Sequence, residues 1–127
     1  MKIFGVGTDI VNIKRIKSSL RNRLFISRIF NKEEVSKCRK IVNYSSCLAK
    51  RFAAKEAFSK ALGTGISKGI HFNEIIILNE KNGKPFIKLL DKTKKIVEKK
   101  IKKKNYKISL SIADEKNYAV AFVTIST

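Results

Sequence analysis

Two short segments of this sequence carry residues that could do chemistry, and the first is Gly5-Val6-Gly7-Thr8-Asp9-Ile10. Asp9 follows directly on an apolar stretch that predicts a strand, and the two glycines allow close backbone packing or a sharp turn there. A carboxylate at a strand end is a common place for a metal ligand. The position also suits an N-cap, in which Asp9 accepts a hydrogen bond from a following helix. Spacing alone leaves both interpretations open.

The second segment runs from Arg51 to Gly65 and begins with a predicted helix that Gly63 is well placed to end. At about 100° per residue, Glu56 shares one helix face with small and aromatic residues and with Lys60, and a charge there is costly unless something pairs with it. Lys60 could pair with Glu56 as an i,i+4 neighbour. Alternatively, Glu56 holds a metal and Lys60 a phosphate oxygen. Mg²⁺ suits such a site because it takes one or two carboxylates plus waters and substrate phosphates.

Gly63-Thr64-Gly65 follows this helix as a flexible turn. Backbone N–H groups in such a turn can face an anion. The segment is not a P-loop, because no Gly-Lys-Ser/Thr follows at the required spacing.

The remaining pattern predicts the elements that must position these segments. A strand is expected over 2–7, followed by a helix with Ile10, Ile13, Ile16 and Leu20 on one face and a basic outer face. A helical piece is expected over 24–30, a helix from the Asn31–Glu34 capping box to about Val42, and a helix from a Ser45 or Ser46 cap to Leu62.

Two hairpins and one more helix complete the prediction. Asn82-Gly83 is a strong turn signal between strands over 74–78 and 85–89. Asp91 is a candidate cap for a helix over 91–104, whose lysine run 102–104 is interpreted as a solvated end. Strands over 107–113 and 118–125 form a second hairpin closed by 114–117. We therefore expect one α+β domain over residues 1–127, with mostly antiparallel strands packed with helices.

Charge and composition limit the kinds of partner that this protein could have. The chain has 127 residues, 43% of them apolar, and a formal net charge of +19. Such a charge favours a polyanionic partner, meaning a nucleic acid, an anionic membrane or an acidic protein. Lysine, isoleucine and asparagine all have A/T-rich codons, however, so mutational drift is an equal explanation of the excess. No helix-turn-helix, zinc or aromatic RNA-binding motif supports a nucleic-acid-binding protein.

The two cysteines and the apolar segments indicate a cytoplasmic protein. Cys38 and Cys47 match no common zinc or redox spacing, so we expect two reduced thiols packed in or near helices. No stretch approaches the roughly 20 apolar residues of a membrane span. The segment 1–7 lacks the features of a signal peptide.

Taken together, the two segments resemble the signature of the holo-acyl-carrier-protein synthase family, the small bacterial branch of the 4′-phosphopantetheinyl transferases. The resemblance is carried by Gly7-Thr8-Asp9-Ile10-Val11 and by Lys50 to Ala57, which contains Lys55-Glu56-Ala57. It continues through Lys60-Ala61, the glycine turn, Gly83-Lys84-Pro85 and Tyr118 to Ala121, and so covers nearly the whole chain. Many members carry a Ser/Thr-His pair where this chain has Ala113-Asp114. That departure puts a ligand role of the loop in doubt, and Asp114 is interpreted as an ordinary turn residue.

The resemblance implies a reaction and a set of roles. Family members use Mg²⁺ and coenzyme A to transfer phosphopantetheine to a serine of acyl carrier protein, in support of fatty acid biosynthesis, and adenosine 3′,5′-bisphosphate leaves. Carried over, Asp9 and Glu56 become metal ligands and Lys60 a catalytic cation. Lys60, Gly63, Thr64 and Gly65 bind coenzyme A. The serine proton goes to Glu56 or to a metal-bound water, and the sequence does not decide between them.

The resemblance also implies partners. Family members form homotrimers that hold each coenzyme A between two subunits, which suits a small chain with little concave surface. The acidic carrier protein would meet a basic first helix carrying Lys14, Arg15, Lys17, Arg21 and Arg23, with Arg15 and Arg21 as its contacts. A catalytically inactive member that only binds carrier protein is the nearest alternative, and the intact Asp9, Glu56 and Lys60 argue against it.

Overall fold

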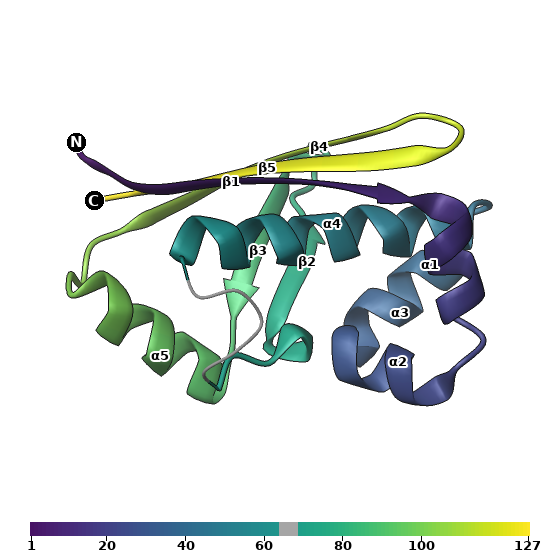
Figure 1. Ribbon diagram of the computed structural model, residues 1–127, viewed down its shortest axis with the longest axis horizontal. Coiled ribbons are helices and arrows are strands. Elements are labelled where there is room, and N and C mark those ends of the chain that lie inside the picture. The colour runs from purple at the N-terminus through teal and green to yellow at the C-terminus, as the bar shows by residue number, and fades with distance from the viewer. Residues whose placement is uncertain (64–68) are drawn as a thin grey trace.

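A three-stranded antiparallel sheet forms one layer of the computed structural model, which describes residues 1–63 and 69–127 (Figure 1). Its strand order is β1-β5-β4, with β1 at Ile3–Asn12, β5 at Tyr118–Ser126 and β4 at Lys107–Asp114. The register sets Asp9 of β1 opposite Ala121 of β5 and Ala121 opposite Ile112 of β4. Strands β4 and β5 therefore form the predicted hairpin.

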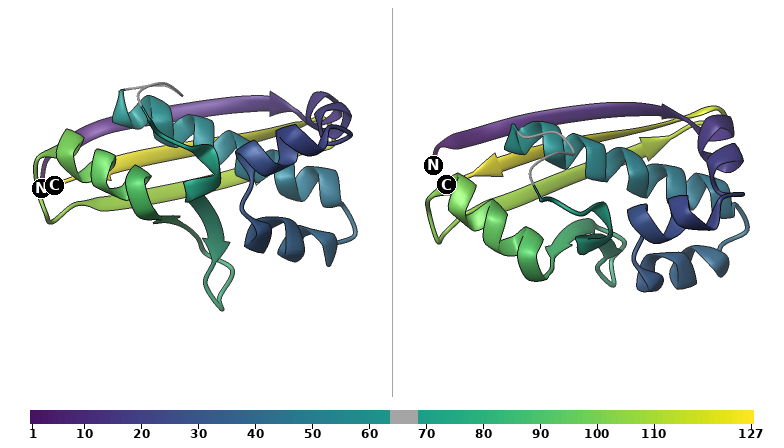
Figure 2. Two further views of the ribbon diagram at one scale, coloured as in Figure 1. Left: turned by 90° about the horizontal axis from the view of Figure 1, so that it is seen from below. Right: turned by 60° about the horizontal axis from the view of Figure 1, so that its bottom comes forward.

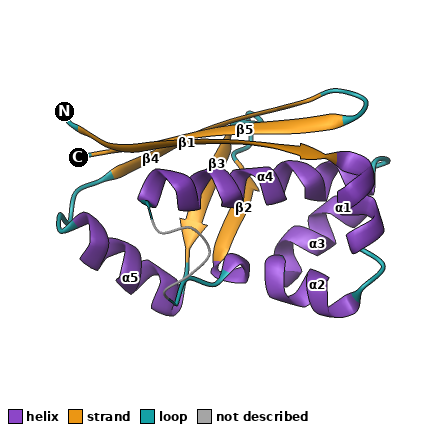
Figure 3. Ribbon diagram, in the orientation of Figure 1, coloured by secondary structure: helices purple, strands orange, loops and turns teal. Residues whose placement is uncertain are grey.

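The helix α4 (Tyr44–Leu62) lies along the inner face of this sheet (Figures 1 and 3). It begins at Asn43, whose side chain accepts a hydrogen bond from Ser46 N, so the prediction of a cap at Ser45 or Ser46 is wrong. Asparagine caps as well as serine does. The helix ends as predicted at Gly63, which has a left-handed φ of 85°. Most of α4 is buried because the sheet covers one side and the other elements cover the opposite side.

Backbone contact between β1 and α4 depends on two glycines. A Cβ built on Gly5 would lie 1.9 Å from the carbonyl oxygen of Ala61, and one built on Gly7 would lie 1.9 Å from that of Ala57. No larger residue could occupy either place without moving the backbone. The strand therefore lies directly on the helix, and the next inward-facing residue of β1 is Asp9, which is only partly exposed.

Three short helices cover one end of α4: α1 (Ile13–Ser19), α2 (Arg23–Ile29) and α3 (Lys32–Arg39). β1 is longer than predicted and extends to Asn12, which caps α1 through its side chain. The N-cap interpretation of Asp9 is therefore wrong, and Ile10 lies in the strand rather than on the first helix. The capping box of Asn31 and Glu34 is confirmed, although α3 ends at Arg39 instead of near Val42.

The other hairpin lies below the middle of α4, and the last helix lies at the end of the molecule away from α1, α2 and α3 (Figures 1 and 2). A one-turn 3₁₀ helix, η1 (Phe72–Glu74), leads into β2 (Ile75–Asn79), which pairs with β3 (Pro85–Leu89) around the predicted turn. The helix α5 (Asp91–Ile101) follows without any side-chain cap, so Asp91 does not cap it. The helix ends at Ile101 rather than at the predicted residue 104. The lysines 102–104 therefore lie past its end, and they are exposed as predicted.

A buried ion pair ties α4 to its neighbours. Lys55 is fully buried, and its Nζ donates to Glu34 Oε1 at 2.6 Å, to Phe72 O at 2.8 Å and to Ile75 O at 2.6 Å. The Glu34 carboxylate also accepts from the backbone of Asn31 and Ile77. Every N–H of the Lys55 ammonium thus has a partner, which offsets the cost of burying both charges.

The expectation of two reduced thiols is wrong, because Cys38 and Cys47 form a disulfide. Both cysteines do pack in helices, as expected. Cys38 lies in the last turn of α3 and Cys47 in the first turn of α4, and the turn between the helices brings their Cα atoms to 5.5 Å. A sequence separation of 9 does not reveal this approach. As for membranes, none of the helices in the described ranges is both long and apolar enough to span one.

Candidate active site

The inner face of β1 presents Asp9 to α4, where it meets Lys60. Lys60 Nζ donates to Asp9 Oδ1 at 3.0 Å and to the backbone oxygen of Thr8 at 3.0 Å. The Asp9 side chain is 15% exposed and the Lys60 side chain 53% exposed. The simple i,i+4 interpretation, in which Lys60 pairs with Glu56, is therefore wrong, since the ammonium reaches across to the strand instead.

Glu56 completes this cluster from the same helix. Burial raises the pKa of its carboxyl above the ordinary value of 4.5, and the negative charge of Asp9 raises it further, while the Lys60 ammonium acts in the opposite direction. Two carboxylates thus lie close enough to repel each other, with one cation between strand and helix to offset them. A carboxyl group whose pKa is shifted by burial and by a neighbouring charge is typical of a functional site.

The donor set fits a hard divalent cation. Asp9 and Glu56 offer carboxylate oxygens, which are the ligands that Mg²⁺ prefers, and their mutual repulsion is relieved when a cation binds. Within residues 1–63 and 69–127, no group of three or more His, Cys, Asp or Glu side chains could hold a metal. Two carboxylates are too few for a structural metal site. They suit Mg²⁺, whose remaining ligands can be waters and phosphate oxygens.

The glycine turn after α4 is described only at its first residue. Gly63 N–H donates to the carbonyl oxygens of Ser59 and Lys60, so it closes the helix and is not available to an anion. The Gly63 amide therefore does not face an anion, as the turn was predicted to do. Thr64 and Gly65 lie outside the described residues.

The basic surface predicted for carrier-protein docking is spread over two helices. Lys14, Arg15 and Lys17 lie on α1, Arg21 lies between the helices, and Arg23 begins α2. All five are exposed. Ile13 and Ile16 on the opposite side of α1 pack against Ala49 of α4. This packing leaves the charged side of α1 facing solvent, close to the strand that carries Asp9.

A pocket that the sequence does not predict lies on the side of α4 away from Asp9 and Lys60. It encloses about 480 Å³ between α4, the β2–β3 hairpin and the end of β4, and Lys50, Arg51, Asn79 and Asp114 line it with eight other residues. Lys50-Arg51 stands in the quoted motif, but helical periodicity gives no reason to expect an arginine at a position that is only 7% exposed. A buried arginine is the signal that marks the pocket, and burial is not visible in the sequence.

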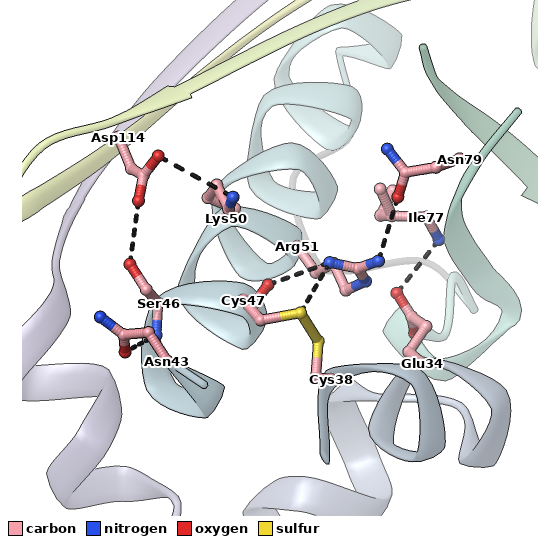
Figure 4. The surroundings of a disulfide bond; sticks show 10 residues. All are labelled: Glu34, Cys38, Asn43, Ser46, Cys47, Lys50, Arg51, Ile77, Asn79 and Asp114. Atoms are coloured by element: carbon pink, nitrogen blue, oxygen red, sulfur yellow. Dashed lines mark hydrogen bonds and ion pairs between the residues drawn. A yellow bond between two sulfur atoms is a disulfide. The ribbon is translucent and has the colours of Figure 1, made fainter. Parts of the chain in front are cut away.

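Arg51 is held in this pocket with part of its hydrogen-bonding capacity unused (Figure 4). Its Nη1 donates to Cys47 O and to Cys47 Sγ, both at 3.2 Å, and its Nη2 donates to Asn79 Oδ1 at 3.3 Å. Its Nε is buried and has no hydrogen-bond partner among the described residues. Burial lowers the pKa of the guanidinium, and the Glu34 carboxylate partly offsets this.

Asp114 is not the ordinary turn residue that was expected. Its carboxylate accepts from Ser46 Oγ at 3.0 Å and lies 3.8 Å from Lys50 Nζ (Figure 4). Asp114 therefore ties the end of β4 to α4 and holds the Lys50 ammonium at the pocket.

Comparisons of the sequence and of the structure with known proteins agree on a family. The family model of the 4′-phosphopantetheinyl transferase superfamily matches residues 5–123. A holo-[acyl-carrier-protein] synthase of Pelagibacter ubique is 50% identical over 125 residues, 98% of each chain. The crystal structure of the synthase from Neisseria meningitidis aligns with a TM-score of 0.86 at 36% identity, covering 98% of this chain and 99% of that one. That of Bacillus anthracis, in complex with CoA (3′,5′-ADP), aligns with a TM-score of 0.81 at 32% identity, over 100% and 99%.

Proposed function

We propose that this chain, which belongs to the 4′-phosphopantetheinyl transferase superfamily, transfers the 4′-phosphopantetheine group of coenzyme A to a serine of apo-acyl carrier protein. The products are holo-acyl carrier protein and adenosine 3′,5′-bisphosphate, and the holo form serves fatty acid biosynthesis. One observation carries the proposal. Asp9 of β1 lies beside Lys60 of α4 and close enough to Glu56 to raise its pKa, at the junction where the two family segments meet.

The chemistry requires positioning and charge neutralisation more than covalent help. We assign Asp9 and Glu56 as the residues that would hold Mg²⁺, which when bound neutralises charge on the pyrophosphate. Lys60 contributes a second cation for a phosphate oxygen, as a point charge on a flexible stem. Because its side chain is half-exposed, it can turn from Asp9 to an incoming phosphate.

The transfer itself forms one bond and breaks one. The serine oxygen attacks the β-phosphorus, the phosphorus–oxygen bond to the adenosine bisphosphate breaks, and the serine proton must leave. Glu56 is one candidate acceptor, because its carboxylate lies in the cluster where the serine must bind, and a water held at the same site is the other.

The pocket around Arg51 is the proposed place for the adenosine bisphosphate end of coenzyme A. It contains two cations, Lys50 and Arg51, and the Arg51 Nε still needs a hydrogen-bond acceptor. A related structure contains 3′,5′-ADP, whose phosphates match this requirement.

Asp9 and Glu56, the acid pair, lie on a different side of α4 from this pocket. This arrangement supports a site shared between subunits. Asp9 is on β1 and Asp114 on β4, the two edges of the sheet. Arg51 and Glu56 point roughly 140° apart around α4 at 100° per residue. A ligand that used both within one chain would have to pass over the helix. In a homotrimer, the pocket of one subunit can instead face the acid pair of the next.

The outer face of the sheet offers the surface for such an assembly. Six large apolar side chains on β1 and β5 are 38–64% exposed on this face: Phe4, Val6, Ile10, Tyr118, Val120 and Phe122. A contiguous patch of this kind marks an interaction site. We propose that it packs against the same face of other copies, and that Arg15 and Arg21 remain free to meet the acidic carrier protein.

A direct assay tests the activity. The purified chain is incubated with coenzyme A, Mg²⁺ and an apo carrier protein, and mass spectrometry follows the carrier. We expect the carrier to gain the mass of one phosphopantetheine, and a carrier whose acceptor serine is replaced by alanine to gain none. An unmodified carrier after prolonged incubation with active, folded protein would refute the proposal.

Mixing experiments test the shared site. Glu56→Ala chains lack the acid pair but keep the pocket, whereas Arg51→Ala chains keep the acid pair. Co-refolded mixtures should recover part of the activity that each variant lacks, and the wild type should sediment as a trimer. A fully active monomer at assay concentration would contradict the assembly.

A further inference from the structure

The disulfide lies against the proposed nucleotide pocket. We propose that Cys38 and Cys47 form a thiol–disulfide switch that sets the affinity of the Arg51 pocket for the phosphates of the adenosine bisphosphate group. The inference rests on the proposed function, because it assigns that group to this pocket.

The bonded cysteines are part of the pocket wall. Cys47 lines the pocket, and so do Ile41 and Asn43, which lie in the turn that the disulfide closes. Cys38 is fully buried and Cys47 is 3% exposed, and Cys47 lines the pocket, so the pocket is a route by which a reductant can reach the bond. An occupied pocket would therefore shield the sulfur atoms.

Arg51 connects the sulfur to the pocket. Its Nη1 lies 3.2 Å from Cys47 Sγ, and its other acceptors are the neutral oxygens Cys47 O and Asn79 Oδ1. A disulfide sulfur is also neutral and accepts weakly. In the bonded state the guanidinium charge is thus not neutralised by any group to which it is hydrogen-bonded.

The other charged groups near Arg51 are already paired. Glu34 is bound to Lys55 at 2.6 Å, and Asp114 is held by Ser46 and Lys50. Among the described residues, Arg51 is therefore the cation in the pocket that makes no direct ion pair, although the Glu34 carboxylate acts on it from a distance. A phosphate can supply a direct counter-ion and also accept from the Arg51 Nε.

Reduction changes this balance. A dithiol reductant donates two electrons and two protons, the Cys38–Cys47 bond breaks, two thiols form, and the reductant becomes a disulfide. A thiol next to a guanidinium ionises readily, because the cation stabilises the thiolate. The Cys47 thiolate would then pair with Arg51 through the contact that the sulfur already makes. The pocket loses one net positive charge, and phosphates bind less tightly.

Thermodynamic linkage makes the coupling measurable from both directions. If reduction weakens nucleotide binding by some factor, bound nucleotide must disfavour reduction by the same factor. A charge-assisted hydrogen-bond pair is worth about tenfold in affinity. For a two-electron couple, tenfold corresponds to a shift of about 30 mV in midpoint potential.

The test uses adenosine 3′,5′-bisphosphate as the probe. Its dissociation constant is measured calorimetrically on the oxidised full chain and on the chain reduced with dithiothreitol. We expect the reduced form to bind about tenfold more weakly. Redox titration of the wild type should give a midpoint potential about 30 mV lower with saturating nucleotide than without it. Equal affinities, or an unchanged midpoint, would overturn the proposal.

Two variants separate charge from covalent linkage. Cys38→Ala leaves Cys47 as a permanent thiol and should bind as weakly as the reduced wild type, with no response to dithiothreitol. Cys38→Ala/Cys47→Ala has neither thiolate nor disulfide and should bind like the oxidised wild type. Weak binding by a folded double variant would overturn the charge mechanism. If either variant fails to fold by circular dichroism, the wild-type titration still decides.

The transferase assay keeps the two proposals apart. Absence of transfer in both redox states would refute the proposed function. Transfer in both states with the same KM for coenzyme A would refute the switch alone. The KM for carrier protein serves as the internal control and should not respond to dithiothreitol, because the docking residues Arg15 and Arg21 lie on α1 and in the turn after it rather than in the pocket.

Discussion

Lys60 of α4 is bonded to Asp9 of β1, with 3.0 Å between Nζ and Oδ1, rather than to Glu56 one turn away on its own helix. The ammonium therefore joins the helix to the strand through the carboxylate that is proposed to hold a metal. A metal held by Asp9, as proposed, would compete with the ammonium for the same carboxylate. The Lys60 ammonium would then be free to pair with a phosphate oxygen.

Replacing Lys60 should separate these two roles. Lys60→Met removes the competing ammonium, so the Mg²⁺ concentration for half-maximal activity should stay the same or fall. The phosphate loses its cation at the same time, and kcat/KM for coenzyme A should fall by about 100-fold. Steady-state assays over a range of Mg²⁺ measure both quantities. A strongly increased Mg²⁺ requirement would show that Lys60 supports the metal instead of competing with it.

The two carboxylates should behave as one unit. Asp9→Ala and Glu56→Ala should each remove nearly all transfer activity, and the double variant should be little worse than either one. Folding should survive, because removing one carboxylate from the metal-free site relieves repulsion. Thermal unfolding with and without Mg²⁺ checks this independently of activity. Near-normal activity of either variant at low Mg²⁺ would remove that residue from the metal site.

The raised pKa of Glu56 gives a pH prediction for the metal-free protein. In Asp9→Asn the negative neighbour is gone, so the Glu56 pKa should move down toward 4.5, as followed by NMR titration of its carboxyl carbon. In the wild type, the stability that depends on this carboxyl is fully present below pH 4.5 and is lost as the pH rises through the raised pKa. Glu56→Gln should therefore unfold at a higher temperature than the wild type at neutral pH, and this advantage should disappear near pH 4. A Glu56 pKa unchanged in Asp9→Asn would mean that burial alone raises it.

The sequence pattern predicted most elements because their signals are local. The Asn31–Glu34 capping box, the Gly63 helix end and the Asn82-Gly83 turn each depend on a few adjacent residues, and each is confirmed. The predicted first helix begins too early in the chain, because Ile10 fits the helical spacing of Ile13, Ile16 and Leu20. Ile10 is instead an outward-facing strand residue that is 64% exposed, and periodicity assumes that apolar residues face inward.

The features that the sequence does not predict all depend on contacts between segments far apart in the chain. Lys55 is charged and fully buried, because Glu34 and two backbone carbonyls come from other elements to meet it. The disulfide and the Arg51 pocket need the α3–α4 turn and the β2–β3 hairpin to be in place. Asp9 and Glu56 are candidates from their positions at a strand end and on a helix face, together with the family motifs. The Lys60 contact with Asp9 instead follows from the backbone packing at Gly5 and Gly7.

That packing gives the next prediction. A methyl group at position 7 would lie 1.9 Å from the Ala57 oxygen, so Gly7→Ala must push β1 away from α4. We expect a loss of about 3 kcal/mol in the free energy of unfolding and, because Asp9 moves with the strand, a large loss of activity. Gly83→Ala is the control, since Gly83 has a φ of 91° but no atom within 4 Å of an added Cβ. It should cost only about 1 kcal/mol, and only its unfolding is compared, because Gly83 also lines the Arg51 pocket. Equal destabilisation in urea titrations would show that backbone conformation rather than contact matters.

The last prediction separates functional charge from charge that mutational drift has supplied. Arg15 is exposed on α1 near the strand that carries Asp9, while Lys103 is exposed beyond the end of α5. Arg15→Glu should raise the KM for carrier protein by roughly 5- to 30-fold, because a reversed rim charge acts mainly on encounter. Its effect on the KM for coenzyme A should be much smaller.

Lys103→Glu changes the net charge by the same amount and is the matched control. If docking depends on position, this variant should stay close to the wild type under the same conditions. Added salt should weaken the wild type more than Arg15→Glu, because the variant has already lost part of the attraction that salt screens. Equal effects of the two substitutions would mean that the charge acts only in bulk. The carrier protein would then be steered to the molecule as a whole, and the basic side of α1 would not be its docking surface.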